Sequence, residues 1–214
     1  MSRQSLSPAR LEAFSDGVIA VIITIMVLEL KAPEYDGMAG LRAALPKVFL
    51  YLLTFVQVGI YWVNHHYLVD EIDTVSHGIL WSNLIFLFCL SLFPFATDWI
   101  DARGLSHFST ALYAGVSILP GVSYTALWIQ IRSQSVAPAH ASWGKLVASS
   151  ALYLLAIPVA FLSTVASLVM ISAVAVMWLL PPKAEVPEKD DYCPSPRQTG
   201  ISAGDSATSE ADKR

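Results

Sequence analysis

Long apolar segments with almost no charged residues dominate the sequence and restrict the folds that the chain can adopt. The first of them runs from Gly17 to Leu28 without one charged side chain. Only 14% of the 214 residues are charged, whereas soluble domains carry about 25%. Twelve of the 30 charged residues lie in positions 183–214, so the remaining chain has too little charge to cover a surface exposed to water. We therefore predict an all-α membrane protein.

Six segments are apolar enough to cross a bilayer as helices, which requires about 20 mainly apolar residues each. The pair Ser7-Pro8 is typical of a helix start, and Pro120-Gly121 predicts a kink in the fourth helix. Residues 146–180 are too many for one crossing, so we expect a tight turn near Phe161–Thr164. The predicted helices span residues 8–30, 46–62 with an extension to 67, 79–97, 109–131, 146–161 and 164–180.

The chain divides into two parts of different composition. Residues 1–182 form the predicted six-helix transmembrane domain, whereas residues 183–214 are rich in Pro, Ser, Asp and Glu. A segment of that composition cannot offset the entropy of ordering, so we predict a disordered C-terminal tail. Lys and Arg residues number six on the side that holds the N-terminus and four on the other. This excess predicts a multi-pass protein of the cell membrane with both termini in the cytoplasm.

Four polar residues stand near the start of the first helix: Arg10, Glu12, Ser15 and Asp16. Arg10 and Glu12 fit the lipid headgroup region, where charge costs little. Asp16 lies deeper in the helix, and a rise of about 1.5 Å per residue places its carboxylate at the edge of the hydrocarbon layer. A carboxylate at that depth indicates a functional site and needs a partner.

The neighbouring helix ends offer such partners. The second helix ends in YWVNHHYLVDE, which contains Trp62 and His65, and the third begins with HGILWSNLIFLF, which contains Asn83. Both ends lie on the same side of the membrane as Asp16, so we expect Asp16, His65 and Asn83 to meet at one depth. The adjacent histidines His65 and His66 point in different directions on a helix, so we predict no metal site.

The motif at the start of the first helix resembles that of a known family. Arg10, Phe14, Ser15 and Asp16 carry the Arg-x-x-x-Phe-Ser-Asp signature of the transmembrane protein 175 family of potassium channels. Similarity extends to WVNHH in the second helix and to WSNLIFLFCLSLFPFAT in the third. The resemblance implies a potassium-selective channel that lacks the TVGYG filter, which is also absent here. It further implies a homotetramer in lipid whose first helices line a central pore, with potassium as the permeant ion and no cofactor.

The first helix supplies the candidate pore residues. Val21, Ile25 and Leu28 recur at spacings of four and three residues and therefore share one stripe of the helix. The resemblance implies a hydrophobic constriction at Val21, further narrowing at Ile25 and Leu28, and a contribution of Thr24 to selectivity. Val21 is smaller than the Ile or Leu expected at its position, so we expect a wider constriction.

In the channel interpretation, a network of side chains braces the pore helix. Its predicted members are Arg10, Phe14, Ser15, Asp16, Trp62, His65 and Asn83. Glu29 and Glu34 would concentrate cations at the outer mouth. The brace is therefore structural, not catalytic.

Other functions follow from the same residues. A cation/proton-coupled secondary transporter would use Asp16 and His65 as a relay, because histidine titrates near neutral pH. Such transporters often contain paired broken helices, and only one break, at Pro120-Gly121, is visible here. No Ser-His-Asp grouping or phosphate loop predicts an enzyme. The net charge of −4 favours no nucleic-acid partner.

Overall fold

The computed structural model describes residues 7–134 and 143–180, and these residues form helices and no strands. The helices are α1 (Pro8–Leu28), α2 (Gly37–Val69), α3 (His77–Ser91), α4 (Phe93–Arg103), α5 (His107–Arg132), α6 (Trp143–Leu162) and α7 (Thr164–Leu179). Leu92 alone separates α3 from α4, so the two form one span, His77–Arg103. The described chain therefore has the six helices that the sequence predicts.

Five of these spans are long and apolar enough to cross a membrane: α1, α2, α3 together with α4, α5 and α6. The sixth helix, α7, is apolar but has only 16 residues. At about 1.5 Å per residue it would extend about 24 Å, somewhat less than the hydrocarbon thickness of about 30 Å. The predicted all-α membrane fold is confirmed. The predicted tail, residues 183–214, lies outside the described residues.

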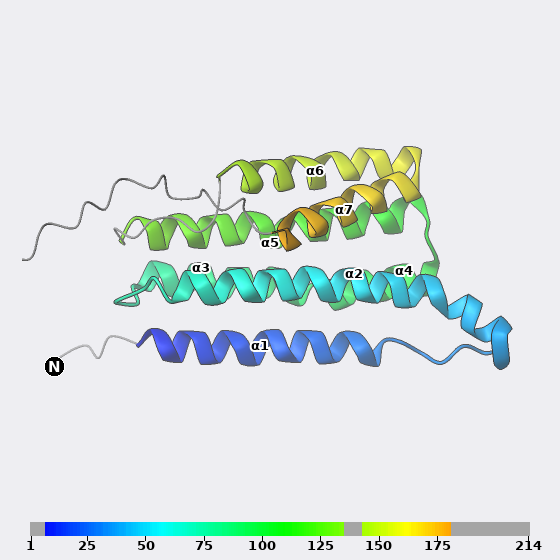
Figure 1. Cartoon of the computed structure of the whole chain (residues 1–214), viewed down its shortest axis with the longest axis horizontal. Helices are drawn as coiled ribbons and strands as arrows, with labels where there is room; N and C mark the ends of the chain where they lie inside the picture. Colours follow the sequence, from blue (N-terminus) through cyan, green and yellow to red (C-terminus); the bar gives the residue numbers. More distant parts are fainter. Residues whose placement is uncertain (1–6, 135–142, 181–214) are drawn as a thin grey trace, which may run out of the picture. The chain divides into compact units, whose positions relative to one another are not determined.

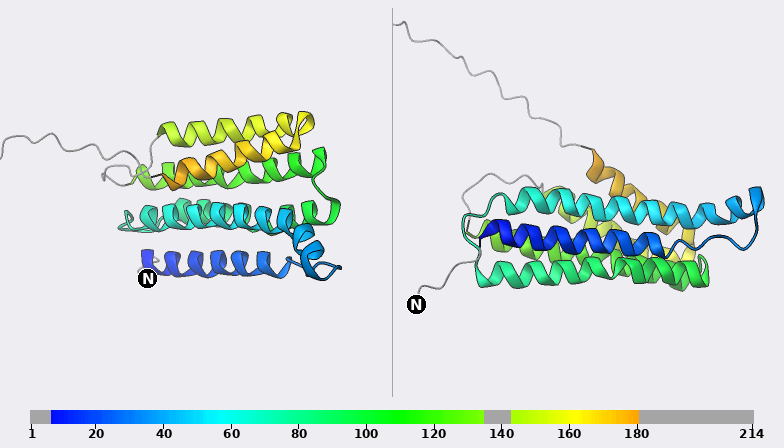
Figure 2. Two further views of the ribbon diagram at one scale, coloured as in Figure 1. Left: turned by 45° about the vertical axis from the view of Figure 1, so that its right-hand side comes forward. Right: turned by 90° about the horizontal axis from the view of Figure 1, so that it is seen from below.

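Consecutive spans run antiparallel in one bundle, with α3 and α4 forming a single span (Figure 1). α5 packs against α3, α4, α6 and α7, whereas α1 lies at one margin of the bundle against α2, α3 and α4 (Figure 2). The start of α1, the connection between α2 and α3, and the end of α5 lie at the same end of the bundle (Figure 1). This arrangement places the motif at the start of α1 beside the last turns of α2 and the first turns of α3.

Two helix boundaries show where the sequence predictions succeed and fail. α2 begins at Gly37 instead of Pro46, because the Asp36 carboxylate accepts a hydrogen bond from the Gly37 N–H at 2.7 Å. Pro46 therefore lies inside α2, whose first turns bend away from the rest of the helix (Figure 1). The predicted turn between the last two helices is confirmed, because only Ser163 separates α6 from α7. Its Oγ accepts a hydrogen bond from the Ala166 N–H at 3.3 Å.

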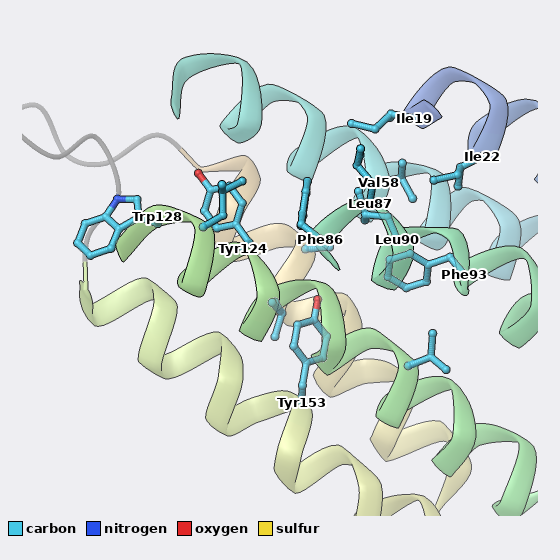
Figure 3. Close-up of a cluster of buried hydrophobic side chains, with 14 of the residues drawn as sticks. Ile19, Ile22, Val58, Phe86, Leu87, Leu90, Phe93, Tyr124, Trp128 and Tyr153 are labelled. Atoms are coloured by element: carbon cyan, nitrogen blue, oxygen red, sulfur yellow. The ribbon is translucent and has the colours of Figure 1, made fainter. Parts of the chain in front are cut away.

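Buried aromatic and aliphatic side chains form the core of the bundle (Figure 3). Phe86, Leu90 and Phe93 of the α3–α4 span are fully buried, and Ile19 and Ile22 reach the same cluster from α1. In lipid, such contacts stabilise the bundle mainly through van der Waals packing. The core therefore holds α1 through the face that carries Ile19 and Ile22.

Candidate functional site on the first helix

The helix α1 has a buried face and an exposed face. Its buried residues are Leu11, Ser15, Ile19, Ile22 and Met26. The predicted pore residues lie elsewhere: Val21 is 54% exposed, Ile25 is 42% exposed and Leu28 is 77% exposed. With 3.6 residues per turn, the centres of these two stripes are about 120° apart around the helix. We call Val21, Ile25 and Leu28 the exposed stripe.

Thr24 is a polar residue beside the exposed stripe. Its side chain is exposed, and its Oγ1 donates a hydrogen bond to the carbonyl oxygen of Val21 at 2.9 Å. The hydroxyl proton is therefore used within the helix, while the remaining lone pair of Oγ1 can coordinate a group outside the subunit. No charged residue lies between Asp16 and Glu29. Between Asp16 and Glu29, the exposed side of α1 is thus apolar apart from this hydroxyl oxygen.

Three buried polar side chains join α1, α2 and α3. His65 Nε2 lies 2.8 Å from Asn83 Oδ1, and Asn83 Nδ2 donates to Ser15 Oγ at 2.9 Å. Ser15 Oγ donates in turn to the Leu11 carbonyl oxygen at 2.8 Å. An amide oxygen only accepts hydrogen bonds, so His65 carries a proton on Nε2 in this arrangement. All three side chains are fully buried, and each hydrogen bond satisfies groups that are costly to bury alone.

Asp16 makes a different contact from the one expected. Its Oδ1 accepts a hydrogen bond from Trp62 Nε1 at 2.8 Å, and Ser15, not Asp16, lies against Asn83. Among the described residues, Asp16 therefore makes no direct hydrogen bond to His65 or Asn83, and the meeting of the three residues at one depth stays a prediction. Successive residues of a helix point about 100° apart, so when Ser15 faces α3, Asp16 faces the edge of α2.

The preceding turn of α1 carries a contact that the sequence analysis did not predict. Glu12 Oε1 lies 2.8 Å from His66 Nδ1, and Asp70 Oδ2 lies 3.7 Å from His66 Nε2. α1 and α2 run antiparallel. Moving four residues back along α1, from Asp16 to Glu12, therefore corresponds to moving four residues forward along α2, from Trp62 to His66. The signal in the sequence was the repeated spacing of four residues, which places each pair on one helix face.

The other two motif residues point away from their own subunit. Phe14 is 53% exposed. The Arg10 guanidinium is exposed and forms no hydrogen bond or ion pair with another residue that the structure describes. Both residues follow the line of the exposed stripe, about two and three turns before Val21. Within the described residues, Arg10 therefore makes no hydrogen bond or ion pair to the other predicted members of the brace, and its place in that network stays a prediction.

The two glutamates considered for the outer mouth lie at the opposite end of α1. Glu29 is the residue that ends α1 and is partly buried, and Glu34 is exposed in the connection to α2. At the same end, Lys47 of α2 pairs with Asp101 of α4 at 2.6 Å. The cation-concentrating role of Glu29 and Glu34 stays a prediction.

Comparisons with known proteins match the part of the chain that carries the motif. Residues 10–94, which contain every motif residue, match a family profile described as endosomal/lysosomal potassium channel TMEM175. The chain is 42% identical over 187 residues to a protein of Chryseobacterium sp. (strain P1-3) named as a potassium channel, and the match covers 83% of this chain and 95% of that protein. It is 35% identical over 127 residues to a potassium channel of Streptomyces collinus, covering 56% of this chain and 62% of that protein.

The fold is also similar to that of a solved structure. A crystal structure described as a lysosomal potassium-selective channel TMEM175 homolog from Chamaesiphon minutus matches with a TM-score of 0.66 and 25% sequence identity. The match covers 80% of this chain and 96% of that one. Because the similarity spans nearly the full length of the Chryseobacterium protein and the motif lies where α1, α2 and α3 meet, this chain belongs to the TMEM175 family.

Proposed function

We propose that this protein is a potassium-selective channel whose pore is lined by the exposed stripe of α1. The observation that carries the proposal is that Val21, Ile25 and Leu28 lie on a largely uncovered face, while the packed face of α1 holds it to the subunit. Exposed apolar side chains alone would also fit a helix that faces lipid. Thr24 adds an exposed hydroxyl at the same level, and relatives of this chain are named as potassium channels.

The proposed pore requires several copies of the chain, because one stripe cannot enclose an aqueous path. We infer a homotetramer with the four α1 helices around a central axis. An apolar hollow of about 570 Å³ lies beside the exposed stripe, and its lining includes Phe14, Val18 and Pro94. A neighbouring copy that filled this hollow would bring a second α1 close to the first.

The mechanism follows from the chemistry of the exposed stripe. Rings of Val21, Ile25 and Leu28 side chains would exclude water and so close the pore to ions. A ring of Thr24 Oγ1 atoms would supply oxygen ligands that replace part of the hydration shell of a potassium ion. Because Val21 is small, we expect the constriction at its level to be wide.

The buried network would keep each pore helix in register with its subunit. Ser15, His65 and Asn83 join three helices, and Asp16 adds a contact to Trp62 at the edge. A brace of buried hydrogen bonds fixes the rotation of α1, and this rotation decides which residues reach the axis. The exposed Arg10 and Phe14 are left for contacts between copies.

The alternative function, a cation/proton-coupled transporter, would need a relay between Asp16 and His65. Asp16 is hydrogen-bonded to Trp62 and His65 to Asn83, so a relay between them would need a further group. We therefore favour the channel. We also propose a multi-pass protein of the cell membrane with cytoplasmic termini, without enzymatic activity and without a cofactor.

Recording from the purified protein in planar bilayers tests the proposal. With potassium on one side and sodium on the other, a channel gives unitary currents whose reversal potential reports the permeability ratio. We expect unitary currents that reverse near the potassium equilibrium potential. Slow flux coupled to protons, without unitary events, would contradict the channel and favour the transporter.

A further inference from the structure

Three side chains at the motif end of α1 form a cluster that the proposed pore does not use. Glu12 comes from α1, and His66 and Asp70 come from the last turn of α2 and the residue that ends it. Each offers one ligand atom, and these atoms all lie within 4.8 Å of one another. The shortest separation is 2.8 Å, between Glu12 Oε1 and His66 Nδ1.

We propose that Glu12, His66 and Asp70 bind a divalent transition-metal ion, for which zinc is the fitting example. An imidazole nitrogen with two carboxylates is a ligand set that suits zinc, whereas calcium and magnesium prefer oxygen alone. Two carboxylates also balance the charge of a divalent ion. Metal–ligand distances of about 2.0–2.2 Å place neighbouring ligand atoms about 3.3–3.6 Å apart, so side-chain rotations that bring both carboxylates to one nitrogen of His66 would close the site.

The hydrogen-bonding capacity of His66 supports a cation at this position. A carboxylate oxygen faces each of its ring nitrogens, at 2.8 Å from Nδ1 and 3.7 Å from Nε2. A ring nitrogen that carries no proton has a lone pair, and it can bind a metal ion together with the carboxylate on its own side of the ring. The second carboxylate joins the same ion after its side chain rotates around the ring.

The surroundings of the cluster leave it accessible to an ion. His66 and Asp70 are exposed and Glu12 is partly buried, so an ion can enter from the aqueous phase and keep water in its open coordination positions. The Trp62 ring lies nearly parallel to the His66 ring, with centroids 6.5 Å apart. Among the described residues, no Lys or Arg forms an ion pair with Glu12 or Asp70.

A metal ion at this site would tie α1 to α2. Glu12 lies one turn before Asp16, so the ion would strengthen the attachment of α1 at the end that carries the motif. If α1 lines the pore as proposed above, the bound ion would also change channel opening. Metal binding itself does not depend on that proposed function.

Isothermal titration of tag-free, chelator-treated full-length protein with zinc chloride tests the site. We expect one binding event per subunit in the wild type that is lost, or weakened at least tenfold, in H66A and D70N. H107A removes an exposed histidine of another helix and serves as the matched control. Magnesium chloride should compete weakly, because it disfavours imidazole.

Thermal unfolding with and without zinc gives a second readout that needs no ion current. Zinc should raise the unfolding temperature of the wild type and of H107A, and should leave D70N unchanged. D70N replaces an exposed side chain with one of the same shape, so it decides the outcome if H66A folds poorly. Equal zinc binding by the wild type, H66A and D70N would show an adventitious ion only and overturn the site. If the protein conducts potassium but does not bind zinc, the metal site is wrong and the proposed channel function stands.

Discussion

Asp16 of α1 accepts a hydrogen bond from Trp62 of α2, with 2.8 Å between Trp62 Nε1 and Asp16 Oδ1. One residue earlier, Ser15 accepts a hydrogen bond from Asn83 of α3. Two consecutive residues of the motif therefore hold α1 to two different helices. This pairing fixes the rotation of α1 and so decides which of its side chains stay exposed.

Removing the carboxylate of Asp16 should weaken the attachment of α1. A hydrogen bond to a charged group is worth about 1.5–3 kcal/mol, so D16A and W62F should each lower the unfolding temperature of the oligomer. The double variant should lose little more than either single variant, because both remove one contact. Thermal stability followed by size-exclusion chromatography measures the effect. W81F is the control, because Trp81 donates to His77 and not to Asp16. If D16A unfolds at the same temperature as the wild type, the contact between Asp16 and Trp62 does not stabilise the attachment of α1.

Removing the Asn83 amide should destabilise the subunit more than removing an amide elsewhere. In N83A the buried Nε2–H of His65 loses its acceptor and Ser15 Oγ loses its donor, and a buried unsatisfied group costs about 1–3 kcal/mol. N64A is the matched control, because Asn64 Nδ2 bonds to the Ile60 carbonyl of its own helix. We expect a clear fall in unfolding temperature for N83A and a small one for N64A. Equal losses would mean that the network adds no specific stability.

An asparagine on the exposed stripe should hydrate the proposed pore. I25N should raise single-channel conductance and lower the preference for potassium over sodium, because polar side chains keep water in a narrow apolar passage. Conductance and reversal potential do not depend on how much protein inserts. Ile22 is 3% exposed whereas Ile25 is 42% exposed, so I22N should act through folding. If I22N and I25N shift the reversal potential equally, the exposed stripe of α1 does not line the pore.

The hydroxyl of Thr24 should set part of the selectivity. T24V keeps the shape of the side chain but removes the oxygen, so we expect the permeability ratio of potassium to sodium to fall. T24S keeps the oxygen and should retain most of that ratio. Reversal potentials under bi-ionic conditions measure both variants. A T24V channel as selective as the wild type would exclude a ligand role for Thr24.

Much of the fold could be predicted from the sequence because membrane insertion depends on local composition. Long uncharged segments such as Gly17–Leu28 predicted helices and a lipid environment, and the unbroken length of residues 146–180 predicted the turn that the structure places at Ser163. The early start of α2 was missed, because Pro46 suggested a helix start while the capping contact of Asp36 lies further upstream. The motif residues were found as a group, since charge near an apolar helix is conspicuous.

The contacts of individual side chains were decided only by the tertiary structure. Nearly every residue of α1 is apolar, so its sequence pattern does not distinguish the buried face of Ile22 from the exposed face of Ile25. The choice between Ser15 and Asp16 as the partner of Asn83 depends on the rotation of α1 by about 100°. The meeting of Glu12 with His66 likewise requires the antiparallel register of α1 and α2. Composition and length determined that these helices form in a membrane, whereas helix rotation and packing determined which side chains meet.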